Sequence, residues 1–378
     1  MKYIVRCVDL DFKKILKPNK VLVLLGPRRV GKTELIKNQL AKLKEPYLFL
    51  NGEDNDTKIF LENRSVENYR RLLSGVKLLI IDEAQDVPNI GKILKLMIDE
   101  IEGLRIVATG SSVFDINNKL GEPLTGRNIP IQLFPLSQME WSKYENLIET
   151  RARLDERLIL GSYPELQQYD TWDEKVKYLQ VLVNSYLIRD ILTFEKLKKP
   201  EKILKLLRLV AFQIGSEVSL SELGQQLGID KKTVERYLDL LTKVFVLYKV
   251  EAFSQNPRKE ISKSARWYFY DNGIRNILIA NVNQLVLRND QGQLWENYLI
   301  TERLKHQSYT NMLVNNHFWR TYNQQEIDWV EERNGKLYAY EFKWNPKKVK
   351  GAPSAWKQFY PEAHFQTIHP ENYLDFIS

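Results

Sequence analysis

The sequence predicts an α/β protein that begins with a parallel sheet and continues through helical segments into a second α/β region. Three observations predict this class. Short apolar runs recur in the first 110 residues and end in glycine, acidic or hydroxyl residues, as buried parallel strands do. Apolar residues with a helical period follow the first of these runs. Near the C-terminus, two strand-like runs flank a turn at residues 333–336.

The first apolar run, residues 21–25, leads directly into G-x-x-x-x-G-K-[ST] without deviation, and residues 34–44 behind it have a helical period. Backbone N–H groups and the helix N-terminus of such a loop face phosphates. Lys32 would reach the β- and γ-phosphates, and Thr33 would place its hydroxyl on Mg²⁺. The alternative is a chance glycine-rich turn, which the strand and helix on either side disfavour. We therefore expect a nucleoside triphosphate to bind the loop residues Gly26, Pro27, Arg28, Arg29, Val30, Gly31, Lys32 and Thr33.

Two later apolar runs, each predicted to be a strand, end in polar residues that we expect beside this loop. Residues 76–81 end in Asp82 and Glu83. Asp82 at a strand tip can hold the Mg²⁺ shell, and Glu83 can polarise the attacking water. Residues 104–108 run into a Thr-Gly-Ser-Ser tip, where Ser111 can sense the γ-phosphate. An ordinary polar strand end is the alternative for Asp82 and Glu83 taken alone, but the upstream loop at this spacing favours hydrolysis.

These motifs resemble the AAA+-type ATPases of bacteria and archaea, in the subgroup fused to a C-terminal restriction-endonuclease-like domain. Leu-Thr-Gly-Arg at residues 124–127 and Pro-Leu-Ser at residues 135–137 also match that family, so the resemblance covers nearly the whole chain. It implies ATP and Mg²⁺ as cofactors. It also implies four segments: an ATPase core at 1–138, a helical lid or connector at 139–199, a winged helix at 200–280 and a nuclease-like domain at 281–378. A Gly-Ser-Tyr-Pro-Glu turn at 161–165, whose role the sequence leaves open, interrupts the lid.

The resemblance also bears on Arg127. In AAA+ enzymes an arginine just before the fifth core strand often reaches the γ-phosphate in the neighbouring subunit. Arg127 falls in that place, which implies a catalytic finger acting in trans and a homo-oligomer, as a ring or similar assembly. A surface arginine that pairs with a local carboxylate is the open alternative.

Composition limits the other classes. The chain has 378 residues with 43% hydrophobic and 28% charged residues, so it is expected to be globular, with two to three domains. No apolar stretch approaches the ~20 residues that cross a bilayer, and residues 1–16 lack a signal-peptide core. A single cysteine, Cys7, suits a reducing compartment. These features predict a cytoplasmic protein without a membrane partner.

The net charge of +8 is concentrated in one segment. Residues 196–266 hold 15 Lys and Arg against 8 Asp and Glu, which predicts a polyanionic partner. Within it, Ser219 or Ser221 caps a short helix that Gly228 ends, and Asp230 caps a second helix.

Two strand-like runs, 244–252 and 266–270, follow the helix pair and enclose a basic stretch, so the segment reads as a winged helix. We expect it to bind duplex or branched DNA through Lys231, Lys232, Thr233, Arg236, Arg258 and Lys259. A winged helix that serves only as a packing or lid module is the alternative.

The C-terminal hundred residues carry a second possible chemistry. Asp328, twelve further residues and then Glu-x-Lys form the PD-(D/E)XK arrangement, although Ile327 replaces the family's proline-like residue. Glu296, in a predicted helix at 292–304, falls at the family's helical carboxylate position. Glu296, Asp328 and Glu341 would then bind Mg²⁺, and Lys343 would position or activate water. Alternating charges on an exposed strand face are the alternative. The tryptophans of this region are expected in the core rather than as base-stacking platforms: Trp295, Trp319, Trp329 and Trp344.

Two function classes follow. The first, which we prefer, is an oligomeric Mg²⁺-dependent ATPase that binds DNA and remodels or translocates it, with phosphodiester cleavage at the C-terminal site as an open addition. The second is a nucleotide-dependent switch of protein assembly, in which the nuclease-like fold is a non-cleaving scaffold.

Overall fold

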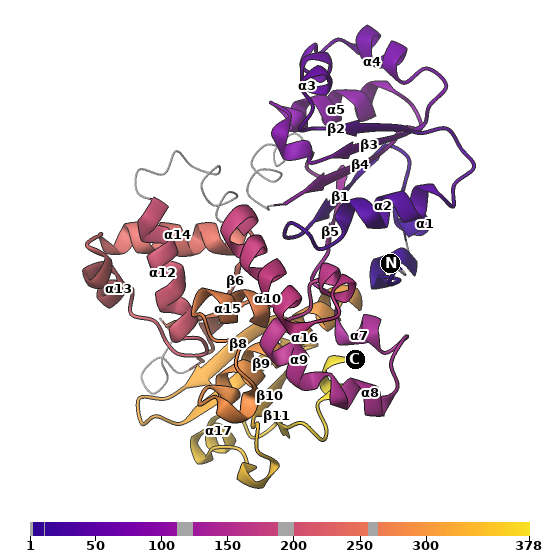
Figure 1. Ribbon diagram of the computed structural model, residues 1–378. Helices are drawn as coiled ribbons and strands as arrows, with labels where there is room; N and C mark the ends of the chain where they lie inside the picture. Colours follow the sequence, from indigo (N-terminus) through magenta and orange to yellow (C-terminus); the bar gives the residue numbers. More distant parts are fainter. Residues whose placement is uncertain (1–2, 11, 112–123, 188–199, 256–263) are drawn as a thin grey trace. The chain divides into compact units, whose positions relative to one another are not determined.

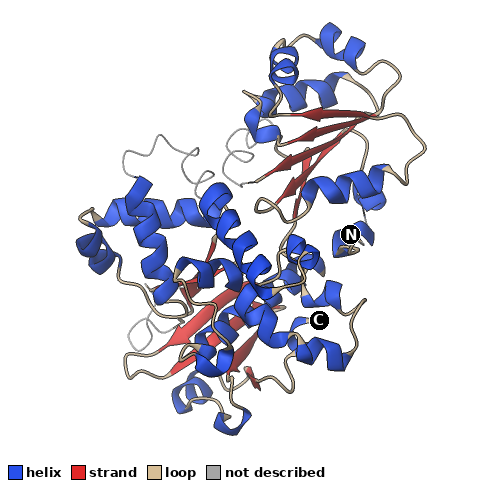
Figure 2. Cartoon of the chain, in the orientation of Figure 1, coloured by secondary structure: helices blue, strands red, loops and turns tan. Residues whose placement is uncertain are grey.

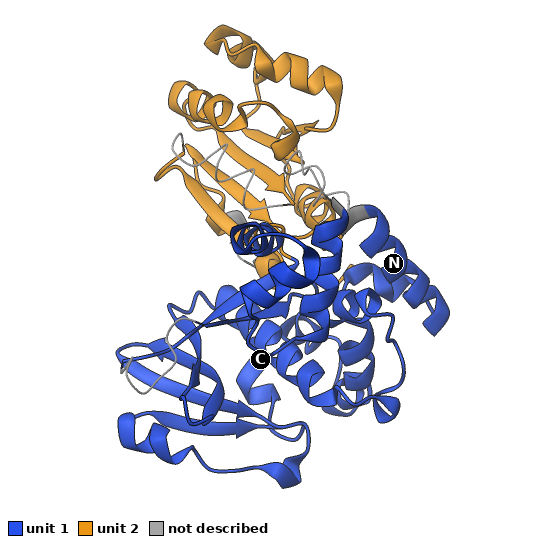
Figure 3. Ribbon diagram, turned by 90° about the vertical axis from the view of Figure 1, so that its left-hand side faces the viewer, with its two compact units in different colours: residues 1, 135–242, 246–378 blue, residues 2–134, 243–245 orange. Residues whose placement is uncertain are grey.

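The computed structural model describes residues 3–10, 12–111, 124–187, 200–255 and 264–378. They divide into two compact units (Figure 3). The N-terminal unit comprises Lys2–Phe134 with Lys243–Phe245, and the C-terminal unit comprises Pro135–Thr242 and Val246–Ser378. The predicted boundary between residues 138 and 139 lies close to the division at Phe134. The other two predicted boundaries lie inside the C-terminal unit, so as domain limits they stay predictions.

The N-terminal unit is built on a five-stranded parallel sheet in the order β2-β3-β4-β1-β5 (Figure 1). Its strands are β1 (Lys20–Leu25), β2 (Leu48–Asn51), β3 (Leu78–Asp82), β4 (Arg105–Gly110) and β5 (Asn128–Gln132). Its helices are α1 (Phe12–Ile15), α2 (Lys32–Leu40), α3 (Asn55–Glu62), α4 (Val66–Leu72) and α5 (Ile90–Glu100), with 3-10 turns at Cys7–Leu10 and Ala84–Asp86. The central strands are almost wholly buried because their residues are apolar on both faces. The predicted parallel α/β core is confirmed.

Parallel pairing brings the carboxyl ends of three strands to one edge of this sheet. Leu25 of β1 pairs with Gly110 of β4, and Ile81 of β3 pairs with Ala108 of β4. The loop after β1 therefore lies at the same edge as Asp82 and Thr109, where ligands of open α/β sheets bind.

The C-terminal unit contains a six-stranded mixed sheet in the order β11-β10-β9-β8-β6-β7. Its strands are β6 (Leu247–Ala252), β7 (Ala265–Phe269), β8 (Asn315–Arg320), β9 (Glu326–Arg333), β10 (Lys336–Phe342) and β11 (His364–Ile368). The β6–β8 and β10–β11 pairs are parallel, and the others are antiparallel. The two strands predicted as a separate wing, β6 and β7, thus extend the C-terminal sheet, because β8 pairs with the edge that β6 would otherwise leave open.

The C-terminal unit is rich in helices, and Figure 2 shows them packed around its sheet. They are α7 (Gln138–Trp141), α8 (Leu147–Ala152), α9 (Leu154–Leu160), α10 (Trp172–Val181), α12 (Pro200–Phe212), α13 (Leu220–Leu227), α14 (Lys231–Lys243), α15 (Asn272–Leu278), α16 (Gln291–Tyr309), α17 (Ser354–Phe359) and α18 (Leu374–Ile377). Short 3-10 segments lie at Pro164–Gln168, Leu285–Leu287 and Pro346–Lys348, and a π-helix lies at Leu182–Leu187. Among the described residues, no helix is long and apolar enough to span a membrane.

The predicted helix pair forms with the predicted caps. The hydroxyl of Ser219 accepts a hydrogen bond from the Glu222 N–H at 3.3 Å, so Ser219 rather than Ser221 caps α13. Gly228 ends this helix with a left-handed φ of 62°. Asp230 accepts the Thr233 N–H at 2.9 Å at the start of α14. These local signals were strong because each cap satisfies an otherwise unpaired backbone group.

The turn at residues 161–165, whose role the sequence left open, docks onto Asp271 at the start of α15. Asp271 accepts the Ser162 N–H at 2.7 Å. A Cβ at Gly161 would lie 1.9 Å from an Asp271 carboxylate oxygen, so only glycine fits there. Burial raises the pKa of Asp271 to about 6.

Candidate functional site

The loop between β1 and α2 has the backbone shape that its glycines predict. Gly26 has a φ of 154°, and a Cβ there would lie 2.1 Å from the carbonyl oxygen of Leu133. Gly31 has a φ of 93° and stands at the N-cap of α2. Because glycine offers no side chain to cap the helix, the N–H groups of the first turn face the loop and suit phosphate oxygens.

Lys32 lies inside this loop. Its side chain is buried, and its Nζ donates to the carbonyl oxygens of Gly26 at 2.9 Å and Pro27 at 3.0 Å. The loop thereby holds the ammonium group at its own centre, where phosphate oxygens can replace the carbonyls as partners. The predicted lysine and its loop are brought together.

Asp82 joins the loop to the neighbouring strands. Its Oδ2 accepts the Thr33 hydroxyl at 2.7 Å, and its Oδ1 accepts the Thr109 hydroxyl at 2.6 Å. Asp82 is 8% exposed. A hydroxyl and a carboxylate side by side are the oxygen ligands that Mg²⁺ takes beside nucleotide phosphates, so these residues fit the predicted ion.

Glu83 follows Asp82 in a left-handed conformation with φ 49°. Its backbone N–H donates to the Thr109 hydroxyl at 2.9 Å, and its carboxylate accepts Gln85 Nε2 at 2.5 Å. Gly52 makes room for this turn, since a Cβ there would lie 2.3 Å from the Glu83 carbonyl oxygen. Ser111 is buried directly after β4, and its predicted contact with the γ-phosphate stays a prediction.

Arg127, the predicted finger, pairs with a carboxylate of its own unit. Its Nε donates to Asp99 Oδ1 at 2.8 Å, and the two side chains are 41% and 34% exposed. This is the local pairing that the sequence left open. A role at a neighbouring subunit stays a prediction.

Arg6 is a residue of this site that sequence reasoning missed. Its buried guanidinium donates through one nitrogen to the Val30 carbonyl oxygen at 2.7 Å and through the other to the Phe134 carbonyl oxygen at 2.6 Å. It therefore braces the phosphate-binding loop against the chain that leaves β5. An arginine inside the apolar stretch at residues 3–8 was the available signal, because a buried arginine needs fixed acceptors.

The C-terminal unit brings the predicted nuclease-like residues into one region, which we call the acidic cluster: Glu296 of α16, Glu326 and Asp328 of β9, and Glu341 of β10. Arg266 of β7 lies among them. One guanidinium nitrogen is 3.7 Å from Glu296 Oε1 and 3.9 Å from Asp328 Oδ1, and the other is 2.9 Å from Glu326 Oε2. The cluster borders a pocket of about 840 Å³.

Further contacts of the acidic cluster also come from within the C-terminal unit. The Tyr268 hydroxyl donates to Glu296 Oε1 at 2.7 Å, and the Phe342 N–H donates to Asp328 Oδ2 at 2.8 Å. Lys343 Nζ donates to Glu341 Oε1 at 2.5 Å. Across the described part of the chain, no group of three or more His, Cys, Asp or Glu is placed to hold a metal ion. The Mg²⁺ site of Glu296, Asp328 and Glu341 stays a prediction, and the Arg266 guanidinium lies within 4.0 Å of oxygens of the first two.

Burial changes the protonation of this cluster. It raises the pKa of Glu296 to about 8, with the charge of Asp328 adding to the effect. It also raises the pKa of Asp328, and it raises that of Glu341 to about 7, again with help from Asp328. Desolvation dominates in each case. An ionised carboxylate loses the stabilisation that water gives it, and the positive charge of Arg266 or Lys343 restores only part of that stabilisation.

Comparison with known proteins bears most directly on the N-terminal unit. Residues 18–142 match a family described as AAA domain. This match agrees with the geometry of the loop and with the contact between Thr33 and Asp82. The N-terminal unit is therefore similar to AAA domains and has the geometry of a P-loop nucleotide site. Residues 151–285 and 291–371 of the chain match two families, each described as a domain of unknown function, DUF8612 and DUF4143.

Relatives that match most of the chain carry no assigned activity in their names. An uncharacterized protein of Methanocaldococcus jannaschii is 25% identical over 317 residues, which cover 78% of this chain and 68% of the relative. An uncharacterized protein of Mycobacterium tuberculosis is 26% identical over 328 residues, covering 85% and 70%. Among solved structures, a Walker-type ATPase of Pyrococcus abyssi has a TM-score of 0.47 at 16% identity, covering 71% of this chain and 94% of that one.

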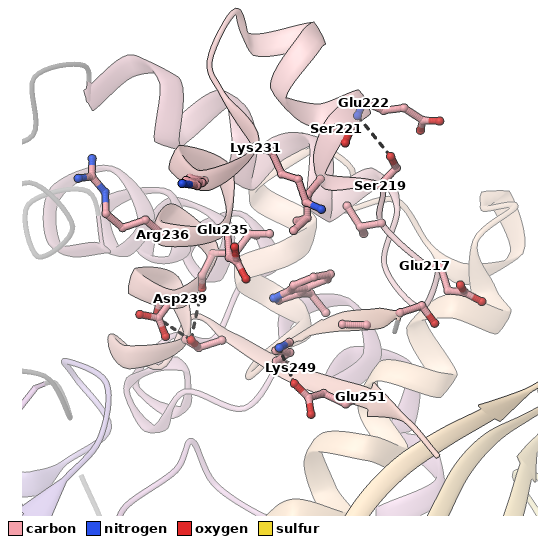
Figure 4. Close-up of a pocket in the computed structure, with 18 residues that line it drawn as sticks. Glu217, Ser219, Ser221, Glu222, Lys231, Glu235, Arg236, Asp239, Lys249 and Glu251 are labelled. Atoms are coloured by element: carbon pink, nitrogen blue, oxygen red, sulfur yellow. Dashed lines mark hydrogen bonds and ion pairs between the residues drawn. The ribbon is translucent and has the colours of Figure 1, made fainter. Parts of the chain in front are cut away.

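The C-terminal unit contains the helix pair predicted to bind DNA. Lys231, Lys232 and Arg236 of α14 are exposed, whereas the Thr233 hydroxyl donates to Asp230 at 2.7 Å and serves the cap. Arg258 and Lys259 lie outside the described residues. Beside α14 lies a groove of about 1140 Å³ that also reaches α13, β6 and β7 (Figure 4). Its charged lining is mixed in sign: Lys231, Lys232, Arg236 and Lys249 with Glu217, Glu222, Glu235, Asp239 and Glu251.

Proposed function

We propose that this protein hydrolyses ATP in a Mg²⁺-dependent reaction. The observation that carries the proposal is Asp82, whose two oxygens are held by the hydroxyls of Thr33 and Thr109 at the edge of the sheet where the P-loop lies. When bound with ATP, Mg²⁺ neutralises charge on the phosphate oxygens.

The protein's own groups divide the work. Lys32 exchanges its loop carbonyls for phosphate oxygens, and the N–H groups at the start of α2 supply further donors. Glu83 orients the attacking water. Thr109 contacts both the Asp82 carboxylate and the Glu83 backbone, so it would hold Glu83 in position relative to the residues that would bind Mg²⁺.

Steady-state ATP turnover tests this step. The wild type should release phosphate only when Mg²⁺ is present, and Lys32→Ala should lose turnover by about 100-fold or more. Turnover that survives in Lys32→Ala would remove the P-loop as the site. Lys37→Ala serves as the matched control, since Lys37 is an exposed lysine of the same helix.

We further propose that the ATPase acts on DNA, which α14 grips through Lys231, Lys232 and Arg236 while ATP turnover remodels or translocates the strand. The concentration of positive charge in residues 196–266 and the well-capped helix pair support this. A homo-oligomeric ring, in which Arg127 would exchange Asp99 for the neighbouring subunit's nucleotide, belongs to the same proposal.

The test compares ATP turnover with and without duplex, branched and single-stranded DNA. Duplex or branched DNA should raise the rate, and Lys232→Glu with Arg236→Glu should abolish the increase, while Lys177→Glu on the exposed face of α10 should not. Binding should weaken steeply with salt. If no DNA raises the rate and no salt-sensitive binding occurs, the DNA proposal fails and ATP hydrolysis stands alone.

A second candidate is the nucleotide-dependent assembly switch with a non-cleaving C-terminal fold. The mixed charge of the groove beside α14 favours it, because acidic side chains oppose a polyanion but suit a protein surface of mixed charge. Its test is the mass of the particle by light scattering with ADP and with a non-hydrolysable ATP analogue. An unchanged mass in both states, together with DNA-stimulated turnover, would reject it.

A further inference from the structure

The acidic cluster already contains a cation. Arg266 is 3% exposed, and its guanidinium lies within 4.0 Å of carboxylate oxygens from Glu296, Glu326 and Asp328. A divalent ion bound by Glu296 and Asp328 would have to lie against this guanidinium, and two cations without water between them repel strongly.

The guanidinium is held from several sides. Its plane lies over the Phe318 ring, with 4.5 Å from Cζ to the ring centroid. Backbone pairing of β7 with Val250 of β6 and an isolated bridge to Glu217 fix the chain that carries it. Arg266 is therefore part of the packed interior rather than a surface side chain that can leave at little cost.

Both carboxylate oxygens of Asp328 already face other groups of the protein. One oxygen faces Arg266 and the other accepts the Phe342 N–H. Lys343, which a nuclease would direct at water, is paired with Glu341. The motif residues thus contact one another and Arg266, while Arg266 Nε and Glu341 Oε2 are buried without a hydrogen-bond partner among the described residues.

We infer that Arg266 is a built-in cation that takes the place of a divalent metal in the acidic cluster, so the C-terminal fold holds no catalytic metal and does not cleave phosphodiesters. This inference goes beyond ATP hydrolysis and does not depend on it, because all of its residues belong to the C-terminal unit.

The experiment measures Mn²⁺ binding by calorimetry on the full chain without nucleotide, in a Thr33→Ala background that removes the hydroxyl ligand of the P-loop. In the protein with Arg266 intact, Asp328→Asn should leave Mn²⁺ binding unchanged. Arg266→Gln should gain a Mn²⁺ site that Asp328→Asn removes, because the carboxylates lose their internal cation. This site should be at least about tenfold tighter than any Mn²⁺ binding by the wild type. Arg266→Lys keeps the charge and should bind as weakly as the wild type.

Thermal unfolding distinguishes a variant that binds Mn²⁺ from one that only folds poorly. Arg266→Gln should melt lower than the wild type in EDTA and regain part of the loss in millimolar Mn²⁺. The matched control is Arg303→Gln, since Arg303 is a buried arginine of the same unit that pairs with Glu331 at 2.6 Å. It should melt lower without any recovery in Mn²⁺.

Three outcomes would overturn the inference. The first is a Mn²⁺ site in the wild-type Arg266 protein that Asp328→Asn removes, and the second is nicking of DNA by the wild type that the same substitution removes. The third is an Arg266→Gln protein that shows neither a Mn²⁺ site nor Mn²⁺-dependent recovery, including one that stays unfolded with and without the ion.

Discussion

Asp82 and Asp328 are both buried aspartates on strands, each predicted from the sequence to hold Mg²⁺, and the structure surrounds them with different partners. Asp82 accepts two hydroxyl groups, from Thr33 and Thr109. Asp328 faces the Arg266 guanidinium and accepts a backbone N–H. Hydroxyl partners leave the negative charge of Asp82 available to an incoming cation, and one of them, Thr33, is itself predicted to be a metal ligand. A guanidinium partner already neutralises Asp328.

The comparison shows that a carboxylate motif does not by itself define a metal site. What decides is whether the neighbouring side chains are neutral or positively charged, and in both regions those neighbours come from other elements of the fold. Four predictions test this difference, and the one with the strongest expected effect concerns the two aspartates themselves.

Exchanging each aspartate for asparagine separates the two sites most strongly. Asp82→Asn should lower Mg²⁺-dependent ATP turnover on the order of 100-fold, because the amide keeps the size but loses the charge that holds the ion. Asp328→Asn should leave turnover within about twofold. Phosphate release at saturating ATP measures both. Equal losses in the two variants would contradict the separation.

The brace at Arg6 should matter for binding ATP more than for turning it over. Arg6→Met leaves the Val30 and Phe134 carbonyl groups without their donor, so the P-loop loses its fixed shape. We expect KM for ATP to rise by about tenfold with a smaller change in kcat.

Two further variants of the N-terminal unit serve as a rescue and as a control for Arg6→Met. Arg6→Lys should recover part of the effect, since an ammonium group can reach one carbonyl. Arg71→Met, which removes an exposed arginine paired with Glu67, should change neither constant. A pure loss of kcat in Arg6→Met would point instead to a group at the reacting phosphate.

The acidic cluster should make stability depend on pH. Glu296 has a pKa of about 8 in the folded protein against 4.5 for an ordinary glutamate, so between these values the folded state binds more protons than the unfolded chain. Its contribution to the free energy of unfolding therefore falls as pH rises from 5 to 8. Glu296→Gln stays neutral and keeps an acceptor for Tyr268, so its stability relative to the wild type should rise over this range by more than about 1 kcal/mol.

Urea unfolding at pH 5, 6, 7 and 8 measures this difference. The control is Glu362→Gln, an exposed glutamate whose effect should be the same at every pH. A constant gap between Glu296→Gln and the wild type would mean that Glu296 is ionised throughout, and that the acidic cluster is better neutralised than Arg266 alone allows.

The smallest effect is expected at Arg127. An exposed pair such as Arg127–Asp99 stabilises a fold by less than about 1 kcal/mol, so Arg127→Ala and Asp99→Ala should lower the free energy of unfolding slightly and alike. Neither should change ATP turnover at protein concentrations where light scattering shows a monomer. In the proposed ring, Arg127→Ala should abolish turnover while sparing nucleotide binding, and Asp99→Ala should not; equal turnover of both variants in the assembled state would reject the finger acting in trans.

The sequence by itself determined the features that depend on neighbours along the chain. The P-loop followed from Gly26, Gly31, Lys32 and Thr33, because their spacing fixes a strand, a turn and a helix start together. A cap at Ser219 or Ser221 and the cap at Asp230 followed for the same reason, since a cap needs only the next three residues, and the structure selects Ser219. The parallel sheet of the N-terminal unit followed from apolar runs that alternate with helical periods, whereas its strand order did not.

Which distant side chains meet depends on the tertiary structure. Arg6 lies 128 residues from Phe134 and Arg266 lies 60 residues from Glu326, yet the first pair shares a buried hydrogen bond and the second a part-buried one. The pairing of β6 with β8 and the position of Arg266 in the acidic cluster likewise depend on tertiary packing. The physical reason is that burial and pairing of charges depend on what packing brings alongside, which local spacing does not encode.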